Sequence, residues 1–324
     1  MSVDMSDTPI DTFISTIEGA GSCLKCRYVL PRLVECAPTY FQTGSIRCTE
    51  CGESVDLWLA ALDRAKRLSG MPSWALASLG PGQTSFTIPM ETGKFYPLDL
   101  TNHQVPAGAR ILTRHYSPQG GDQGMVTAVE WHPNDPTHRP RGTLLQLFAV
   151  PILEGSLPRV GPVLVNVTWI RGENSDEWSY LVTAFDAAAK RDYAPALVFA
   201  QSAVEISMMP MIEQNFTKHA SERRVKSFMR DSLTYNHALN VVLPYLCGEA
   251  RTAQMPKVIR LALNKLGEKR NKIIHAGTKA AAISAEDAME GLCAAAFGFE
   301  YIRYISPALL TGPKNPTPQL GSDT

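Results

Sequence analysis

The spacing of hydrophobic and polar positions changes character along the 324-residue chain. Between residues 80 and 172, apolar positions fall into short runs rich in β-branched and aromatic residues, and clusters of Pro and Gly separate the runs. Such runs are typical of strands joined by turns, so we expect a central antiparallel β domain over 80–172. The expected strands are 85–89, 109–116, 124–131, 143–150 and 163–170.

From residue 175 to 307 the hydrophobic period is helical, and prolines and glycines mark the ends of the segments. Pro195 suits the first turn of one helix, which Pro210 should end or kink. The pattern predicts a C-terminal α-helical bundle over 175–307, followed by a disordered tail over 308–324. The expected helices are 177–191, 195–209, 221–243, 256–276 and 284–305.

Residues 1–75 hold five of the seven cysteines and a predicted helix over 54–70. Two C-x2-C pairs separated by 21 residues resemble a four-cysteine zinc ribbon, although this loop slightly exceeds the usual length. Free thiols and disulfides are the alternatives, and both suit a reducing cytosol poorly at this spacing. Four thiolates would close the metal shell, so we expect structural zinc. The expected ligands are Cys23, Cys26, Cys48 and Cys51, whereas Cys36, Cys247 and Cys293 are expected in the core.

The three regions together predict an α+β multidomain protein: a zinc-ribbon-like module at 1–75, the β domain and the helical bundle. A content of 44% hydrophobic and 19% charged residues fits a globular chain. The N-terminus is polar and acidic, and the longest apolar stretch, 143–153, is too short to cross a bilayer. We therefore expect a cytoplasmic protein with no membrane partner.

Charge is distributed unevenly although the formal net charge is zero. Residues 217–280 contain 13 Lys and Arg but four Asp and Glu. A basic segment of this kind suits a polyanion such as RNA, and it equally suits solvated helix faces. The basic residues that we expect to contact RNA are Lys269, Lys272, Arg223 and Arg224.

One basic residue falls in an unexpected place. On an ideal helix Arg270 lies within the apolar stripe that contains Leu263, Leu266 and Ile273. A guanidinium there requires an anion, an edge position or a second protein surface. His275 lies roughly 140° around the helix from Arg270 at 100° per residue, and Asn271 shares the face of His275. A histidine in the last turn before a glycine, as His275 is before Gly277, is also a common helix ending.

The segment Arg270-Asn271-Lys272-Ile273-Ile274-His275 resembles the R-x4-6-H motif of the HEPN superfamily, in which a polar residue often follows the arginine. An earlier helix carrying an acidic residue, here Glu205, agrees with the resemblance, which covers about 175–305. It implies a dimeric, metal-independent endoribonuclease whose two motifs meet at a two-fold interface. It also implies a toxin or anti-phage (abortive infection) role, with an antitoxin or a phage-derived trigger as partner. The implied catalytic residues are Arg270, Asn271 and His275, supported by Glu205.

The chemistry of these side chains fits RNA cleavage. An imidazole exchanges protons with a ribose hydroxyl near neutral pH, and a guanidinium binds a phosphate through two oxygens. One His275 and one Arg270 per chain are few for this reaction, and a homodimer doubles them at one site. The alternative is a non-catalytic dimeric adaptor whose zinc and β modules recruit nucleic acid or a partner protein.

Overall fold

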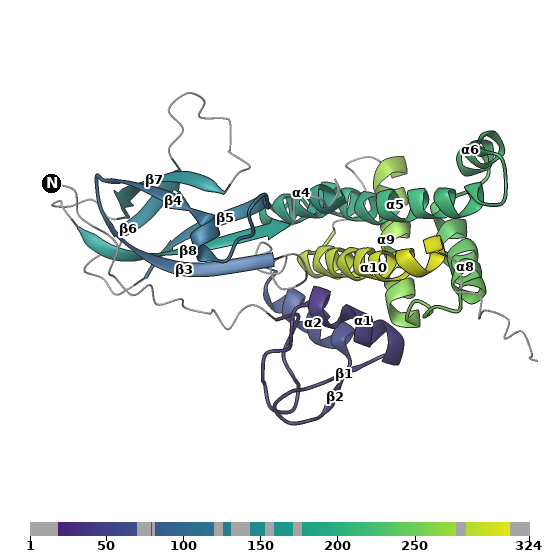
Figure 1. The fold of residues 1–324 in the computed structure, drawn as a ribbon, viewed down its shortest axis with the longest axis horizontal. Coiled ribbons are helices and arrows are strands. Elements are labelled where there is room, and N and C mark those ends of the chain that lie inside the picture. Colours follow the sequence, from purple (N-terminus) through teal and green to yellow (C-terminus); the bar gives the residue numbers. More distant parts are fainter. Residues whose placement is uncertain are drawn as a thin grey trace, which may run out of the picture. The chain divides into compact units, whose positions relative to one another are not determined.

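The computed structural model shows a mixed α+β protein with antiparallel sheets, a helical C-terminal region and a four-cysteine cluster near the N-terminus (Figure 1). It describes residues 19–69, 79, 82–119, 126–130, 143–152, 159–170, 177–276 and 283–311. Contacts divide these residues into two compact units. One is a β unit within 82–170, and the other is a helical unit that joins 19–79 to 177–311. The β unit is therefore inserted between two parts of the helical unit.

The β unit contains two three-stranded antiparallel sheets, with strand orders β3-β8-β5 and β4-β7-β6. All five predicted strands form, and β4 is an additional strand that the sequence pattern did not reveal. A short 3₁₀ helix over Leu100–His103 follows β4. The strands are β3 Gly82–Glu91, β4 Phe95–Asp99, β5 Arg110–Pro118, β6 Val126–Glu130, β7 Leu144–Pro151 and β8 Val160–Ile170.

The core of the β unit is apolar and draws on both sheets. Alternate residues of β8, such as Val163, Val165 and Val167, are fully buried, as the period of two in a strand requires. Phe86 of β3 lies beneath the imidazole of His103, with ring centroids 3.7 Å apart. His103 thus packs against the core, where burial lowers its pKa.

The helical unit contains two short N-terminal helices, a two-stranded hairpin and a set of longer C-terminal helices (Figure 1). The hairpin pairs β1 Ile46–Arg47 with β2 Ser54–Val55. Between α7 and α8 the chain forms one π-helical segment, η2, over Ala238–Val242. The helices are α1 Leu33–Thr43, α2 Leu57–Arg67, α4 Glu177–Ala189, α5 Tyr193–Thr217, α6 Glu222–Asp231, α7 Tyr235–His237, α8 Leu243–Glu249, α9 Lys257–Ala276 and α10 Ala285–Thr311.

Helix α10 forms the centre of this unit, and sixteen of its residues are buried. Glycines let its neighbours come close. A Cβ at Gly291 would lie 2.4 Å from Leu197 Cδ2 of α5, and one at Gly298 would lie 2.9 Å from Leu263 Cδ1 of α9. Both α5 and α9 therefore pack tightly against α10.

The N-terminal segment also packs on α10, through aromatic rings. The rings of Tyr40 and Trp58 lie 5.9 Å and 5.3 Å from that of Phe297, and Phe41 lies 5.2 Å from Tyr301. Such edge-to-face contacts are favourable beyond the area that they bury. The segment expected to be a separate module at 1–75 thus shares a core with the helices.

Three expected helix boundaries differ from the structure. The predicted helix 221–243 is interrupted between α6 and α7, because Thr234 is extended and its hydroxyl caps a new helix at the N–H of His237. Helix α5 continues past Pro210 to Thr217, so that proline does not end it. Helix α10 continues past Pro307 to Thr311, within the expected tail, and residues 312–324 lie outside the described residues.

Helix α5 is, among the described residues, the one helix long and apolar enough to cross a membrane by length and composition. Half of its apolar window is buried inside the protein. Its buried residues include Leu197, Val204 and Ile212, which pack within the helical unit. A buried helix of a bundle passes the same test of length and composition.

Candidate metal centre and candidate active site

The four cysteines predicted as ligands converge on one point. Their sulfur atoms all lie within 4.8 Å of one another, with Sγ to Sγ distances of 3.7 Å between Cys23 and Cys51 and 3.6 Å between Cys26 and Cys48. Four sulfurs placed about 2.3 Å from a tetrahedral zinc ion would be about 3.8 Å apart. The cluster therefore fits a metal ion of this size.

Each C-x2-C pair lies on a turn of the same design. The N–H of Cys23 donates to the carbonyl of Tyr28, and the N–H of Arg27 donates back to Cys23. In the second turn the N–H of Cys48 donates to the carbonyl of Glu53, and the N–H of Gly52 donates to the carbonyl of Cys48. Residues Arg27 and Gly52 both have left-handed φ angles, 63° and 72°, which a glycine adopts without strain.

The thiols of the cluster differ in how readily they ionise. The backbone N–H of Cys26 lowers the pKa of Cys23 to about 7, whereas burial and the neighbouring thiols raise the pKa of Cys26 to about 12, so a metal that binds here must displace the proton of Cys26. Cys23 and Cys48 are buried, and Lys25 joins the two turns by a 2.9 Å ion pair with Glu53. A metal held by four buried or half-buried sulfurs has no open position, so the site fits a structural ion.

The remaining cysteines lie apart from the cluster, as expected. Cys36 is buried in α1, its thiol donates to the carbonyl of Arg32 at 3.1 Å, and burial raises its pKa to about 12. Cys247 and Cys293 are fully buried in α8 and α10. Cys247 lies 3.2 Å from the hydroxyl of Tyr301, which donates to the carbonyl of Ala253.

The R-x4-H segment occupies the last turns of α9. Up to Leu266 the inner face of this helix is buried, and Lys269 forms an ion pair with Asp287 in the first turn of α10 at 2.5 Å. Beyond Lys269 burial decreases: Asn271 and His275 are exposed, and Ile274 is 48% exposed. The motif therefore lies on the less buried end of α9.

Arg270 is half-buried and has no ion pair among the described residues. Its Nη1 donates to Oδ1 of the adjacent Asn271 at 3.2 Å. The structure thus joins Arg270 to Asn271, while no described hydrogen bond joins either of them to His275. The anion or surface that an arginine in an apolar stripe requires is not supplied within the described part of this chain.

Glu205, expected to support the motif, is half-buried on α5. Burial, and secondly the charge of Glu205, raise the pKa of Tyr235. No described hydrogen bond or ion pair links Glu205 to Arg270 or His275. Its electrostatic neighbour is therefore a tyrosine that the sequence did not single out for catalysis.

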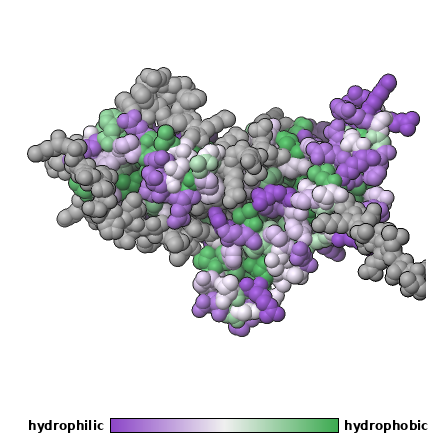
Figure 2. Space-filling view, in the orientation of Figure 1, coloured by the Kyte–Doolittle hydropathy of each residue, from purple (hydrophilic) through white to green (hydrophobic). Residues whose placement is uncertain are grey.

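The residues expected to contact RNA differ in availability. Lys269 is half-buried and already paired with Asp287. Lys272 on α9 is exposed, as are Arg223 and Arg224 on α6. Figure 2 shows hydrophilic residues gathered over α6. Its pairs Lys226–Glu222 and Arg230–Asp231 partly neutralise that helix, whereas Arg223 and Arg224 have no ion pair among the described residues.

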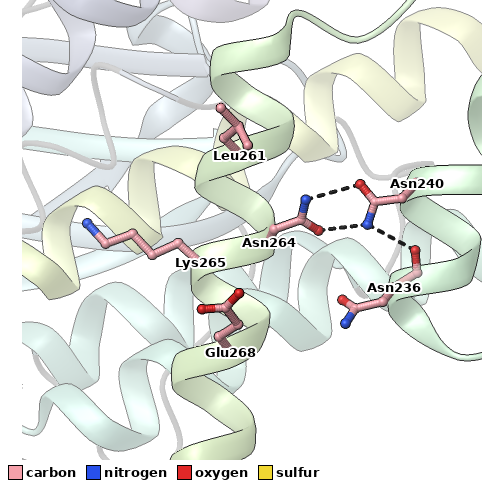
Figure 3. Close-up of a pocket in the computed structure, with 6 residues that line it drawn as sticks. All are labelled: Asn236, Asn240, Leu261, Asn264, Lys265 and Glu268. Atoms are coloured by element: carbon pink, nitrogen blue, oxygen red, sulfur yellow. Dashed lines mark hydrogen bonds between the residues drawn. The ribbon is translucent and has the colours of Figure 1, made fainter.

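A polar depression beside α9 was missed from the sequence (Figure 3). Asn240 of η2 and Asn264 of α9 exchange two hydrogen bonds of 2.8 Å and 3.0 Å between their amides. These two residues are 24 positions apart, so only the packing of two helices brings them together. The i, i+4 pair Asn236 and Asn240 was the one signal available in the sequence.

Comparison of the chain with protein-family models, with curated proteins and with solved structures finds no match.

Proposed function

We propose that the protein is a metal-independent endoribonuclease of the HEPN type that acts as a homodimer. The observation that carries the proposal is the placement of Arg270, Asn271 and His275 on the less buried end of α9, with the arginine free of ion pairs in the described chain. A buried or half-buried guanidinium without an anion is costly in a purely structural role. A phosphate of RNA is the anion that this arrangement suits.

A second copy of the chain supplies what one copy lacks. Near Arg270, Ile273 is half-buried and Ile274 is exposed. The end of α9 therefore presents an apolar and a basic surface together. Pairing of two such ends about a two-fold axis covers the isoleucines. It also places two arginines and two histidines at one site.

In the proposed reaction the neutral His275 of one copy takes the proton of the ribose 2′-hydroxyl, and Arg270 binds the scissile phosphate. The hydroxyl oxygen attacks phosphorus, and the bond to the 5′-oxygen breaks as that oxygen takes a proton from the protonated His275 of the second copy. Asn271 orients the guanidinium through the hydrogen bond already present in the structure. Lys272, Arg223 and Arg224 provide further positive charge for the RNA backbone.

The remaining parts have supporting roles in this proposal. The four-cysteine cluster holds a structural zinc ion that fixes α1 and α2 near α10, and the β unit senses a trigger or selects substrate. A toxin or anti-phage role in the cytoplasm accords with such a nuclease, with an antitoxin or a phage-derived trigger as its regulator.

The test is an RNA digest in EDTA followed by analysis of the product ends. We expect cleavage to continue in chelator, because arginines supply the charge that metal ions supply in two-metal nucleases. The products should end in 2′,3′-cyclic phosphate, and DNA should resist because it lacks the nucleophile. Activity that disappears with EDTA, while His275→Ala retains it in magnesium, would reject the proposal.

A non-catalytic adaptor is the second candidate, and the surface of the first cysteine turn favours it. Leu24 and Tyr28 are 62% and 48% exposed beside the cluster, which is an apolar surface of the kind that binds partners. In that case the purified dimer would cleave no RNA, and Leu24→Ser would abolish partner binding without altering the metal content.

A further inference from the structure

The polar depression between η2 and α9 is a built surface with a volume of about 330 Å³. Figure 3 shows α9 on one side and the segment carrying Asn236 and Asn240 on the other. Three of the lining residues are asparagines, and an acid, a base and a leucine complete the set. The lining residues are Asn236, Asn240, Leu261, Asn264, Lys265 and Glu268.

Hydrogen bonds already fix two of the asparagines. The Nδ2 of Asn240 donates to the carbonyl of Asn236 and to Oδ1 of Asn264, and its Oδ1 accepts from Nδ2 of Asn264. Both donor hydrogens of Asn240 are therefore engaged. The side-chain amide of Asn236 has no hydrogen bond among the described residues, so it offers a donor and an acceptor side by side.

Close packing fixes the position of Asn236 relative to α9. A Cβ at Gly267 would lie 3.3 Å from Cε1 of Tyr235 and 3.8 Å from Oδ1 of Asn236. The absence of a side chain at Gly267 thus lets α7 approach α9. The polar groups of this surface are therefore held in place before a ligand binds, which limits the entropy lost on binding.

The other lining residues, which all lie on α9, differ in charge and in polarity. Glu268 is exposed, and no ion pair occupies its carboxylate among the described residues. The ammonium of Lys265 is instead held by Glu290, with both Nζ to Oε distances 3.0 Å, and Figure 3 shows it directed away from the asparagines. Leu261 is 55% exposed and can cover the face of a planar ring.

We propose that this depression binds one nucleobase with an exocyclic amino group, presented by single-stranded RNA, and that it selects the sequence that the nuclease cuts. A carboxylate accepts from an amino group, and a free amide reads a donor and an acceptor on the base edge. Uracil lacks the amino group and should bind worst. The inference rests on the proposed nuclease function and names a subsite for its substrate.

The position of the depression along α9 fits such a subsite. Glu268 precedes His275 by seven residues, which is two turns and about 10 Å along the axis at 1.5 Å per residue. On an ideal helix both lie on the same face, with Asn271 and Lys272 between them. Stacked nucleotides are about 3.4 Å apart, so about three of them span this distance. An RNA strand that follows this face would therefore place the bound base about three nucleotides from the cleaved bond.

The composition favours a base over a second protein chain. The centres of protein interfaces are depleted in charged residues and rich in aromatic ones. Here one leucine stands among three asparagines, a carboxylate and a paired lysine. Ile273 and Ile274 at the end of α9 suit the second copy better than this surface does.

The experiment compares wild type with Asn236→Ala and Glu268→Gln on an RNA library of random sequence, with the bases around each cut counted. Glu249→Gln is the control, because Glu249 is exposed on α8 outside the depression and has no described ion pair. We expect wild type and control to prefer one amino-bearing base at a fixed distance from the cut. Each test variant should reduce that preference about tenfold.

A binding assay separates failure of this subsite from failure of the nuclease. Fluorescence anisotropy of His275→Ala with six-nucleotide homopolymers of A, C, G and U should show the weakest binding to U. The double variant His275→Ala with Glu268→Gln should bind all four homopolymers equally.

If wild type cuts no RNA but His275→Ala binds U more weakly than the other homopolymers, the nuclease proposal fails and the base site is supported. If wild type cuts RNA and Glu268→Gln leaves the base preference unchanged, the base site fails alone. Conversion of a dimer to a monomer by Asn236→Ala in light scattering would assign the surface to a second copy and overturn the inference.

Discussion

The four-cysteine cluster and the end of α9 differ in how completely one chain builds them. All four sulfurs of the cluster lie within 4.8 Å of one another, on two turns fixed by matching backbone hydrogen bonds. At the end of α9, Arg270 contacts only its neighbour Asn271 by a described hydrogen bond, and His275 is exposed. The cysteine cluster could be completed by an ion alone, whereas the end of α9, in our proposal, is completed by a second copy of the chain and RNA. Ligands that face one another closely are typical of a structural site, and charged groups left without an ion pair are typical of a binding site.

The largest expected effect follows removal of a metal ligand. Cys48→Ser should release the ion, and because structural zinc contributes about 10 kcal/mol or more to folding in small domains, residues 19–69 should lose their fold. Loss of their aromatic contacts with Phe297 should then lower the melting temperature of the helical unit. Metal analysis and thermal circular dichroism measure both effects.

Cys36→Ser is the matched control for the metal ligand. It removes a buried thiol of α1 that lies outside the cluster, so the metal content should remain one equivalent per chain. Less than half an equivalent of zinc per chain in the purified wild-type protein would show that the cluster carries no structural ion.

A second, smaller loss of stability is expected at Gly291, which is buried on α10 in the packed centre of the helical unit. A Cβ there would lie 2.4 Å from Leu197 Cδ2 and 3.2 Å from Leu266 Cδ1, so Gly291→Ala should cost about 1–2 kcal/mol because these two buried leucine side chains must move. At Gly248 of α8 a Cβ meets nothing within 4 Å. Gly248→Ala should therefore stabilise the protein by about 0.5–1 kcal/mol, because alanine favours the helix. Denaturant unfolding measures both changes, and equal effects of the two substitutions would contradict the packing.

Glu300 on α10 should make stability depend on pH. Its side chain is 3% exposed, Oε1 has no hydrogen-bond partner among the described residues, and burial raises its pKa from 4.5 to about 7. Arg303 offsets this only weakly, from a distance of 3.7 Å. The folded state thus binds the proton more tightly, so this contribution is full below pH 4.5 and is lost as the pH rises through 7.

Glu300→Gln should therefore stabilise the protein more at high pH than at low pH. The gain in unfolding free energy should be about 2 kcal/mol larger at pH 8 than at pH 5.5, from the pKa difference at 1.36 kcal/mol per unit. Urea unfolding of both proteins at the two pH values measures it. A gain that is the same at both values would show that Glu300 ionises normally in the folded protein.

The sequence predicted features that depend on neighbours along the chain. The C-x2-C spacing sets the cysteine turns locally, and the runs of β-branched residues identify five of the six strands described in the β unit. The break at Thr234 was missed because apolar spacing continues across it from Val225 to Leu239, whereas a single capping hydroxyl decides the boundary. The pairing of Asn240 with Asn264 depends on how two distant helices pack, which no local pattern records. The end of α9 was predicted to be a catalytic motif from its residues alone, and the partner surface that we propose for it belongs to a second chain.

The most direct test of the account measures RNA cleavage by wild type, His275→Ala and His219→Ala under the same conditions in EDTA. His275 is exposed near the end of α9, so its loss should change the unfolding free energy by less than about 0.5 kcal/mol. His219 is an exposed histidine in the turn after α5 and serves as the control. The account predicts that His275→Ala lowers the cleavage rate by about 10²-fold or more while His219→Ala leaves it unchanged. Equal rates for all three folded proteins would contradict it and would leave His275 as the ordinary end of a helix.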